Sequence, residues 1–210
     1  MSAGIEKKLH LELSTHRIEA LSDGVFAIVM TILVLDFDIL KPGGVMRGHA
    51  LVEDIVSQWP VFLHFVESFV ILSFFWTKHH QQFHFIEKTD RQFLWLNLFS
   101  LMFLCLIPFS TSLMSDFGDQ SPAAIFFALN MLAVGAIYYF QWVYATSGCR
   151  LVHKDMDQMV VSFYKRMNLV IPALSVASII VSFFIPRAGT FLYMMLPFMI
   201  LMKPYRMVRE

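Results

Sequence analysis

The sequence predicts an all-α membrane protein with six transmembrane helices in a single domain, residues 1–210. Hydrophobic residues make up 57% of the chain and charged residues only 15%, whereas a soluble domain usually has about 25% charged residues. In addition, six apolar stretches approach the roughly 20 residues that a helix needs to cross a bilayer core about 30 Å thick. Lipid is therefore the expected solvent for most of the surface.

Ordinary stop signals separate the predicted spans. A proline and two glycines at 42–44 follow the first span, a turn-rich segment at 118–122 separates the third from the fourth, and another at 186–189 precedes the sixth. The sixth span is the shortest and contains Pro197, which membrane helices tolerate better than soluble ones do. The expected spans are residues 19–40, 56–77, 93–115, 122–146, 166–186 and 189–203.

The basic residues are distributed unevenly between the two sides of the predicted membrane domain. Thirteen of the 16 Lys and Arg residues lie on the side that carries both termini, and only Lys41, Arg47 and Arg187 lie on the other. Because positively charged loops are retained in the cytoplasm, both termini are expected there. The opposite side is net negative, and Asp36 and Asp38, near the end of the first span, form an acidic outer mouth that would concentrate cations.

Composition excludes several classes of protein. The formal net charge is zero and the pI is about 7.1, which gives no indication of a nucleic-acid partner. Cys105 and Cys149 suggest neither a disulfide framework nor a zinc site, and no cofactor is expected. The first apolar run begins too far into the chain, and is too long, to be the core of a signal peptide, so it should remain in the mature protein.

The first span carries an apolar stripe. Ile28, Ile32 and Leu35 are spaced i, i+4 and i+7, so they share one helix face, and Thr31 lies beside Ile32. Any apolar helix offers such stripes, and spacing alone favours a lipid-facing or packing face over a pore.

The polar entrance of this span is more informative. Arg17, Ser22 and Asp23 cost free energy near hydrocarbon unless they have partners, and such groups usually face protein or a water-filled path. Candidate partners at a similar depth are Trp76 and His80, at i and i+4 near the end of the second span, and Asn97 near the start of the third. We expect one hydrogen-bonded cluster of six residues, the anchoring network: Arg17, Ser22, Asp23, Trp76, His80 and Asn97.

Three motifs together resemble one known family. The stretch RIEALSDGVFAIVMTILVLDF, beginning at Arg17, is similar to the signature R-x-x-x-F-S-D-G-x-F-A-I-x-x-T of the transmembrane protein 175 family, the endolysosomal potassium channels and their shorter prokaryotic homologues. The FWTKHH end of the second span and NLFSLMFLCLIPFST in the third are also similar, and the resemblance covers roughly the whole chain. Leu21 departs from the phenylalanine that the family usually has there, which should alter packing at the entrance more than the pore.

The resemblance implies a potassium-selective channel: a homotetramer whose first helix lines a central pore without a carbonyl filter loop. Ile28, Ile32 and Leu35 would form apolar rings that narrow the pore and act as a hydrophobic gate, and Thr31 would place hydroxyls near the constriction to favour potassium. Potassium sheds water more readily than sodium, so dehydration in such a neck favours it. The anchoring network would hold the pore helix. A single six-span unit suggests a prokaryotic plasma membrane, since the animal members carry two.

Two other kinds of protein remain as alternatives. A metal site would use His80 and His84, at i and i+4, with His79 and Glu87 nearby, but the sequence has no H-E-x-x-H motif. These histidines are more typical of interfacial polar residues, and no enzymatic activity is expected.

The second alternative is a proton-coupled secondary transporter. Glu67 is a lone acid at mid-depth in the second span, where it would serve as a proton relay or lie at a contact between helices or subunits. A related interpretation keeps the channel but broadens its selectivity. Without a carbonyl filter discrimination is weak, and rubidium, caesium or protons would pass as well.

Overall fold

The computed structural model describes residues 15–37 and 48–196, and within them every regular element is helical apart from isolated β-bridge residues, such as the pair Ile86 and Val152. The elements, in chain order, are α2 (Thr15–Ile32), η1 (Leu33–Asp36), α3 (Gly48–Ser57), α4 (Trp59–His84), α5 (Arg91–Cys105), α6 (Ile107–Phe117), α7 (Ser121–Thr146), η2 (Ser147–Cys149), α8 (Gln158–Ser182), α9 (Pro186–Phe191) and η3 (Leu192–Met195).

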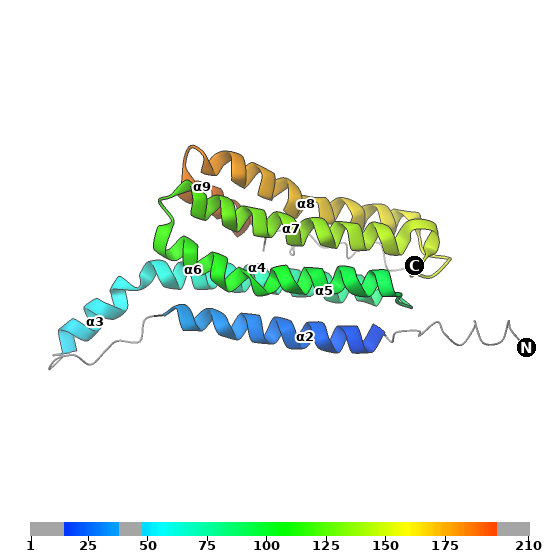
Figure 1. Ribbon diagram of the computed structural model, residues 1–210, viewed down its shortest axis with the longest axis horizontal. Coiled ribbons are helices and arrows are strands. Elements are labelled where there is room, and N and C mark those ends of the chain that lie inside the picture. The colour runs from blue at the N-terminus through cyan, green and yellow to red at the C-terminus, as the bar shows by residue number, and fades with distance from the viewer. Residues whose placement is uncertain (1–14, 38–47, 197–210) are drawn as a thin grey trace, which may run out of the picture.

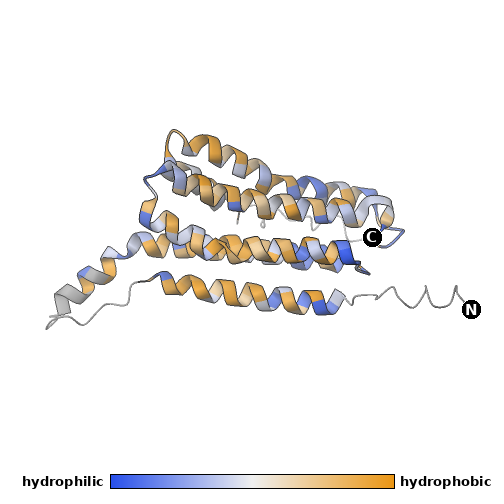
Figure 2. Cartoon of the chain, in the orientation of Figure 1, coloured by the Kyte–Doolittle hydropathy of each residue, from blue (hydrophilic) through white to orange (hydrophobic). Residues whose placement is uncertain are grey.

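Five helical segments within the described residues are long and apolar enough to cross a membrane, and each contains most of one of the first five predicted spans. The all-α membrane architecture is therefore confirmed. In Figure 2, hydrophobic residues run along the length of these helices, and hydrophilic residues gather toward their ends. The segments are Thr15–Asp36, Trp59–His84, Arg91–Phe117, Ser121–Cys149 and Gln158–Ser182.

Where the helix bounds differ from the predicted spans, the reasons are local. The fifth span begins at Gln158 rather than 166, because the Asp157 side chain caps α8 by accepting a hydrogen bond from the Met159 N–H at 2.7 Å. The third span is two helices, α5 and α6, because Pro108 in the first turn of α6 has no N–H to continue the ladder of α5.

The predicted sixth span, 189–203, differs most from the structure. Its described part consists of the end of the six-residue α9 and the single 3₁₀ turn of η3, followed by Leu196, and residues 197–203 lie outside the described part of the chain. The end of the first predicted span, including Asp38, also lies outside the described part of the chain.

The long helices lie roughly parallel in successive layers (Figure 1). α2 lies along one edge and packs on α4 and α5, α5 and α6 pack on α7, and α8 and α9 cover the opposite side. Gly135 allows α7 to approach α8 closely, since a Cβ there would lie 2.7 Å from Ile171 Cγ2. The main core lies between these layers and includes Phe75, Leu104 and Met131.

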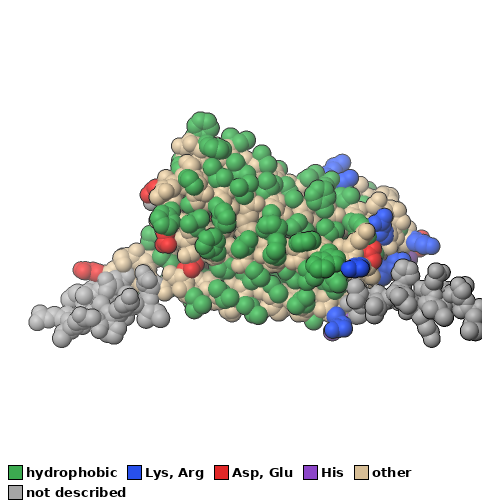
Figure 3. All heavy atoms as spheres, in the orientation of Figure 1, with side chains coloured by type: hydrophobic (Ala, Val, Ile, Leu, Met, Phe, Trp, Pro, Cys, Tyr) green, Lys and Arg blue, Asp and Glu red, His purple; other side chains and the backbone are tan. Residues whose placement is uncertain are grey.

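Charge is separated between the two ends of the bundle. In Figure 3, Lys and Arg side chains gather at the end where α2 begins, and most acidic side chains gather at the end that carries α3. The flank between these ends is largely hydrophobic, as expected for a surface in contact with lipid.

Candidate pore-lining helix

α2 has two unlike faces, and its buried face packs on the rest of the bundle. That face repeats every three or four residues, the spacing that keeps side chains on one side of a helix. Phe26 and Leu33 belong to the main core, and Ile18 packs in a second core cluster with Phe83 and Phe93. The buried residues of this face are Ile18, Ser22, Phe26, Val29 and Leu33.

The opposite face of α2 and η1 is apolar and uncovered in the single chain. Ile28 is 59% exposed, Ile32 41% and Leu35 74%. A Cβ at Gly24, one turn before Ile28, would meet no atom within 4 Å. The stripe predicted from sequence therefore lies on the surface of the chain and not in its core, although burial of such side chains is favourable. We call Ile28, Thr31, Ile32 and Leu35 the exposed stripe.

Thr31 lies on the exposed stripe, and its hydroxyl has a fixed orientation. Thr31 Oγ1 donates a hydrogen bond to the carbonyl oxygen of Ile28 at 2.8 Å. This is a common arrangement of threonine in membrane helices, and it uses the hydroxyl proton. The oxygen lone pairs remain available, so the side chain can still act as an acceptor toward a cation.

Three side chains from three helices join behind the exposed stripe in a buried hydrogen-bonded chain. Asn97 Nδ2 on α5 donates to Ser22 Oγ on α2 at 3.1 Å, and Asn97 Oδ1 lies 3.2 Å from His79 Nε2 on α4. Ser22 Oγ donates in turn to the Ile18 carbonyl oxygen at 2.8 Å. Ser22 and Asn97 are fully buried and His79 is 2% exposed, so the chain fixes the position of α2 against α4 and α5.

A second contact joins α2 to α4 nearer the surface. Trp76 Nε1 donates to Asp23 Oδ1 at 2.9 Å, and Trp76 stacks on His80 with ring centroids 5.9 Å apart. Asp23 and His80 are both exposed in the single chain. His80 therefore supports Trp76 through ring stacking and does not reach Asn97, whereas His79 does.

Of the predicted anchoring network, the structure thus brings together Ser22 with Asn97, and Asp23 with Trp76 and His80. Arg17 is exposed on α2 and makes no hydrogen bond or ion pair with these residues. His79 is the member that sequence reasoning missed, because the i, i+4 spacing from Trp76 selects His80 and does not show which side of α4 faces the core.

Other buried polar contacts between helices were also not predicted from the sequence. Ser68 on α4 and Thr111 on α6 have their hydroxyl oxygens 2.6 Å apart, and Asn130 Nδ2 on α7 lies 3.5 Å from Ser110 Oγ. Inter-helix hydrogen bonds of this kind are common in membrane bundles, where no water satisfies polar groups.

The remaining predicted site residues lie apart from these contacts. Asp36 is partly buried at the end of η1, where its carboxylate faces the Ser112 hydroxyl. Glu67 is 7% exposed, with Oε2 3.5 Å from His64 Nδ1, and its Oε1 has no hydrogen-bond partner among the described residues. His79 is buried, whereas His80 and His84 are exposed, and no group of three His, Cys, Asp or Glu side chains in the described chain is arranged to hold a metal.

Comparison with known proteins supplies independent evidence. The sequence profile of the endosomal/lysosomal potassium channel TMEM175 matches residues 17–108, the segment that contains α2, α4 and α5. A potassium channel of Streptomyces collinus is 35% identical over 148 residues, which make up 67% of this chain and 69% of the relative. The endosomal/lysosomal proton channel TMEM175 of Gallus gallus is 36% identical over 115 residues, which are 52% of this chain but only 23% of that protein.

A solved structure is also similar over almost the whole length. The crystal structure of a lysosomal potassium-selective channel TMEM175 homolog from Chamaesiphon minutus has a TM-score of 0.78 with this chain at 28% sequence identity. The alignment covers 90% of this chain and 97% of the other. The similarity extends across all the layers of the bundle, beyond the residues that the family profile matches.

Proposed function

We propose a function for this chain from one premise: the chain belongs to the TMEM175 family of potassium channels. The family and the relatives described above are ion channels and not enzymes. We propose that this protein is a potassium-selective cation channel, that four copies assemble around a central axis, and that the exposed stripe of α2 lines the pore. No cofactor is required, and potassium is the permeant ion.

The observation that carries the proposal is the contrast between the two faces of α2. Its back is held by the buried Ser22, Asn97 and His79 contacts, while its front exposes large apolar side chains, from 41% at one isoleucine to 74% at the leucine. A helix fixed in this way can hold a narrow constriction at constant width when several copies face one another. Hydrogen bonds also join other helices of the bundle, so the proposal rests on this support together with the exposed apolar front of α2 and the channel family.

The proposed mechanism is dehydration in an apolar neck. Rings formed by Ile28, Ile32 and Leu35 narrow the pore and exclude hydrated ions, so they act as a hydrophobic gate. An ion passes only when it gives up part of its hydration shell, and potassium does so more readily than sodium. The neck therefore favours potassium without a carbonyl filter, and rubidium and caesium should pass for the same reason.

Thr31 is proposed to add to this preference. Its hydroxyl proton is donated to the Ile28 carbonyl, which leaves oxygen lone pairs on the exposed stripe beside the constriction. Four such oxygens would replace part of the water that the ion loses. Ser22, Asp23, Trp76, His80 and Asn97 hold α2 in place and are not ion ligands.

We expect Thr31→Ala to lower the potassium-to-sodium permeability ratio about fivefold, because about 1 kcal/mol of differential ligation is lost. The ratio is measured as a reversal potential under bi-ionic conditions. Thr146→Ala is the matched control, since Thr146 makes the same kind of bond, to the Trp142 carbonyl at 2.8 Å, but lies on α7. An unchanged ratio in Thr31→Ala would remove Thr31 from the selectivity site.

Charge distribution supports an orientation. The end rich in Lys and Arg would face the cytoplasm of a prokaryotic plasma membrane, with both termini on that side. Asp36 at the end of η1, together with Asp38, would then lie at the outer mouth and raise the local concentration of cations.

The function is tested in liposomes that contain the full-length protein. We expect a potassium current. With potassium on one side and sodium on the other, its reversal potential should be shifted from zero toward the potassium equilibrium potential. A reversal potential at zero would show a non-selective cation channel. Currents that appear only with a proton gradient, at the slow rates of a carrier, would favour a proton-coupled transporter.

The proton-coupled transporter is the second candidate because of Glu67. Its carboxyl group is buried in α4 with one oxygen unpartnered among the described residues and a histidine beside the other, which is the kind of site that proton relays use. Proton-driven solute uptake that is lost in Glu67→Gln would support this candidate over the channel.

A further inference from the structure

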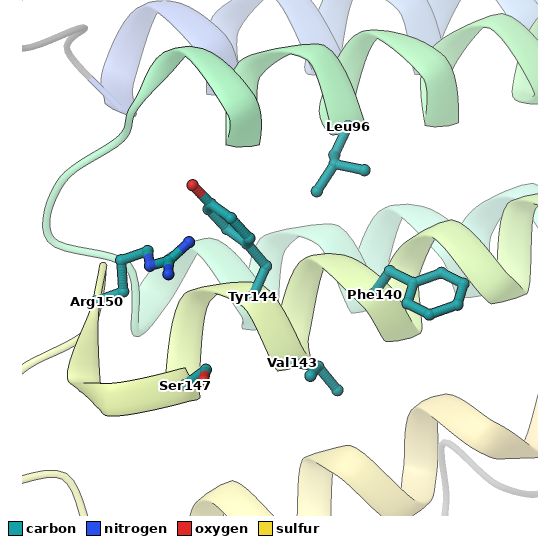
Figure 4. Close-up of a pocket in the computed structure, with 6 residues that line it drawn as sticks. All are labelled: Leu96, Phe140, Val143, Tyr144, Ser147 and Arg150. Carbon is teal, nitrogen blue, oxygen red and sulfur yellow. The ribbon is translucent and has the colours of Figure 1, made fainter.

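A pocket of about 430 Å³ lies between α5 and α7, at the end of the bundle that carries the Lys and Arg residues. Figure 4 shows its lining. Leu96 from α5 and Phe140 from α7 border it toward the middle of the bundle, and Tyr144 and Arg150 border it toward the end. The pocket is therefore apolar on one side and basic on the other. Val143 and Ser147 complete the lining.

A tight turn positions the arginine. Gly148 and Cys149 both have left-handed backbone conformations, with φ of 63° and 51°, so the chain reverses direction directly after α7. The Leu151 N–H closes the turn with a 3.0 Å hydrogen bond to the Ala145 carbonyl. A left-handed conformation is unfavourable for a cysteine, so this geometry is maintained by its surroundings.

The guanidinium of Arg150 is held by an aromatic ring and not by a carboxylate. Its Cζ lies 4.4 Å from the centre of the Tyr144 ring. Tyr144 is held in turn, because its hydroxyl donates to Asp90 Oδ2 at 2.7 Å. The other oxygen of Asp90 accepts the Phe93 N–H at 2.8 Å and caps α5. Among the described residues every ion pair contains a histidine, and none contains Arg150.

We propose that this pocket binds an anionic phospholipid, with the headgroup phosphate on Arg150 and Ser147 and the upper acyl chain along Leu96, Phe140 and Val143. A guanidinium that pairs with no carboxylate of the described residues matches phosphate oxygens well, and a serine hydroxyl adds a donor. Basic pockets between transmembrane helices on the cytoplasmic side are suited to such headgroups. A free phosphate ion would use only the basic end and gain nothing from the apolar wall.

The site is separate from the proposed ion pathway, since it lies between α5 and α7 while the exposed stripe lies on α2. It rests on the proposed orientation, with this end of the bundle at the cytoplasm, and not on the proposed pore. Lipid bound there would join the end of α7 to the start of α5, the two elements that Tyr144 and Asp90 already connect.

The test measures binding of a short-chain phosphatidylglycerol to the purified full-length protein in detergent by native mass spectrometry. We expect saturable binding that falls about tenfold in Arg150→Gln, because a charge-assisted phosphate contact is lost. Arg150→Lys should retain part of the affinity, since it keeps the charge but loses the planar fork. Lys165→Gln is the matched control, because Lys165 is exposed on α8 and does not line the pocket.

Several results would overturn the proposal. Equal losses in Arg150→Gln and Lys165→Gln would show unspecific attraction to a basic surface, and equal binding of a phosphatidylcholine of the same chain length would show that charge is not recognised. If millimolar inorganic phosphate displaced the bound phosphatidylglycerol as well as an excess of the lipid itself does, the site would be assigned to free phosphate. Loss of subunit association in Arg150→Gln, with no lipid bound to the unaltered protein, would assign the pocket to a neighbouring copy of the chain.

Discussion

We expect Ile28→Asn to raise potassium flux through liposomes that contain the protein by at least about tenfold, which corresponds to about 1.4 kcal/mol removed from the barrier to passage. Ile28 is 59% exposed on α2, at the level of Thr31. In the proposed tetramer the substitution would place four amides in the apolar neck. These amides would hydrate the constriction, so an ion would lose less of its water, and the preference for potassium over sodium should fall as the flux rises. A fluorescent flux assay and a bi-ionic reversal potential measure the two effects.

The matched control for this substitution is Ile180→Asn. Ile180 is the same residue type at nearly the same exposure, 56%, but it lies on α8, on the opposite side of the bundle from α2. The control should leave flux and selectivity unchanged, because its asparagine would not line the pore. If both variants assembled and both conducted like the unaltered protein, the exposed stripe of α2 would not form the constriction.

The positions of the long helices could be predicted because hydropathy averages over about 20 residues and tolerates local errors. α3 escaped the prediction for the same reason. It is a helix of ten residues, Gly48–Ser57, and its acidic Glu53 and Asp54 lower the mean hydropathy. Its apolar residues Val52 and Ile55 are exposed. An amphipathic helix of this length is recognised by its period and not by its mean hydropathy.

The candidate site could be predicted only in part, because helix spacing relates residues on one helix but not the helices to one another. The i, i+4 spacing correctly places His80 beside Trp76, and the two rings stack. Adjacent residues point about 100° apart around a helix, so which of His79 and His80 faces Asn97 depends on the rotation of α4 against α5. That rotation is set by core packing between the two helices, including the contact of Phe83 on α4 with Phe93 on α5, whose ring centroids lie 5.7 Å apart, and no single-helix pattern contains it.

The exposed stripe, too, could be predicted from the sequence only in part. Its apolar period is visible in the sequence, and the structure shows that this face is uncovered in one chain. The resemblance to a channel family is confirmed by the matched profile and by the relatives. In the proposed tetramer other copies of the chain would cover the stripe, and a single chain contains none of those contacts, so the constriction, the gate and the tetramer stay predictions.

We expect Asn97→Leu to destabilise the folded protein by about 1–3 kcal/mol, seen as a lower midpoint of thermal unfolding in detergent. Leucine is close to asparagine in size, so the main loss is of hydrogen bonds and not of packing. His79 Nε2 would lose its partner while buried, and α2 would lose its link to α5 through Ser22. Trp76→Phe is the control. It removes the Trp76 to Asp23 bond near the surface, where Asp23 can turn to water, so its cost should be about 1 kcal/mol or less.

The double substitution Ser22→Ala with Asn97→Leu tests whether these residues act as one unit. Ser22 Oγ keeps its bond to the Ile18 carbonyl when Asn97 is lost, so Ser22→Ala should add less in the Asn97→Leu background than it costs alone. We further expect Asn97→Leu to lower the yield of assembled channel while the channels that do form keep their potassium preference, because Asn97 holds α2 from behind and lies off the exposed stripe. Strictly additive stability losses would mean that Ser22 and Asn97 are not coupled. A normal yield with lost selectivity would move Asn97 from the support of the pore helix to the ion path itself.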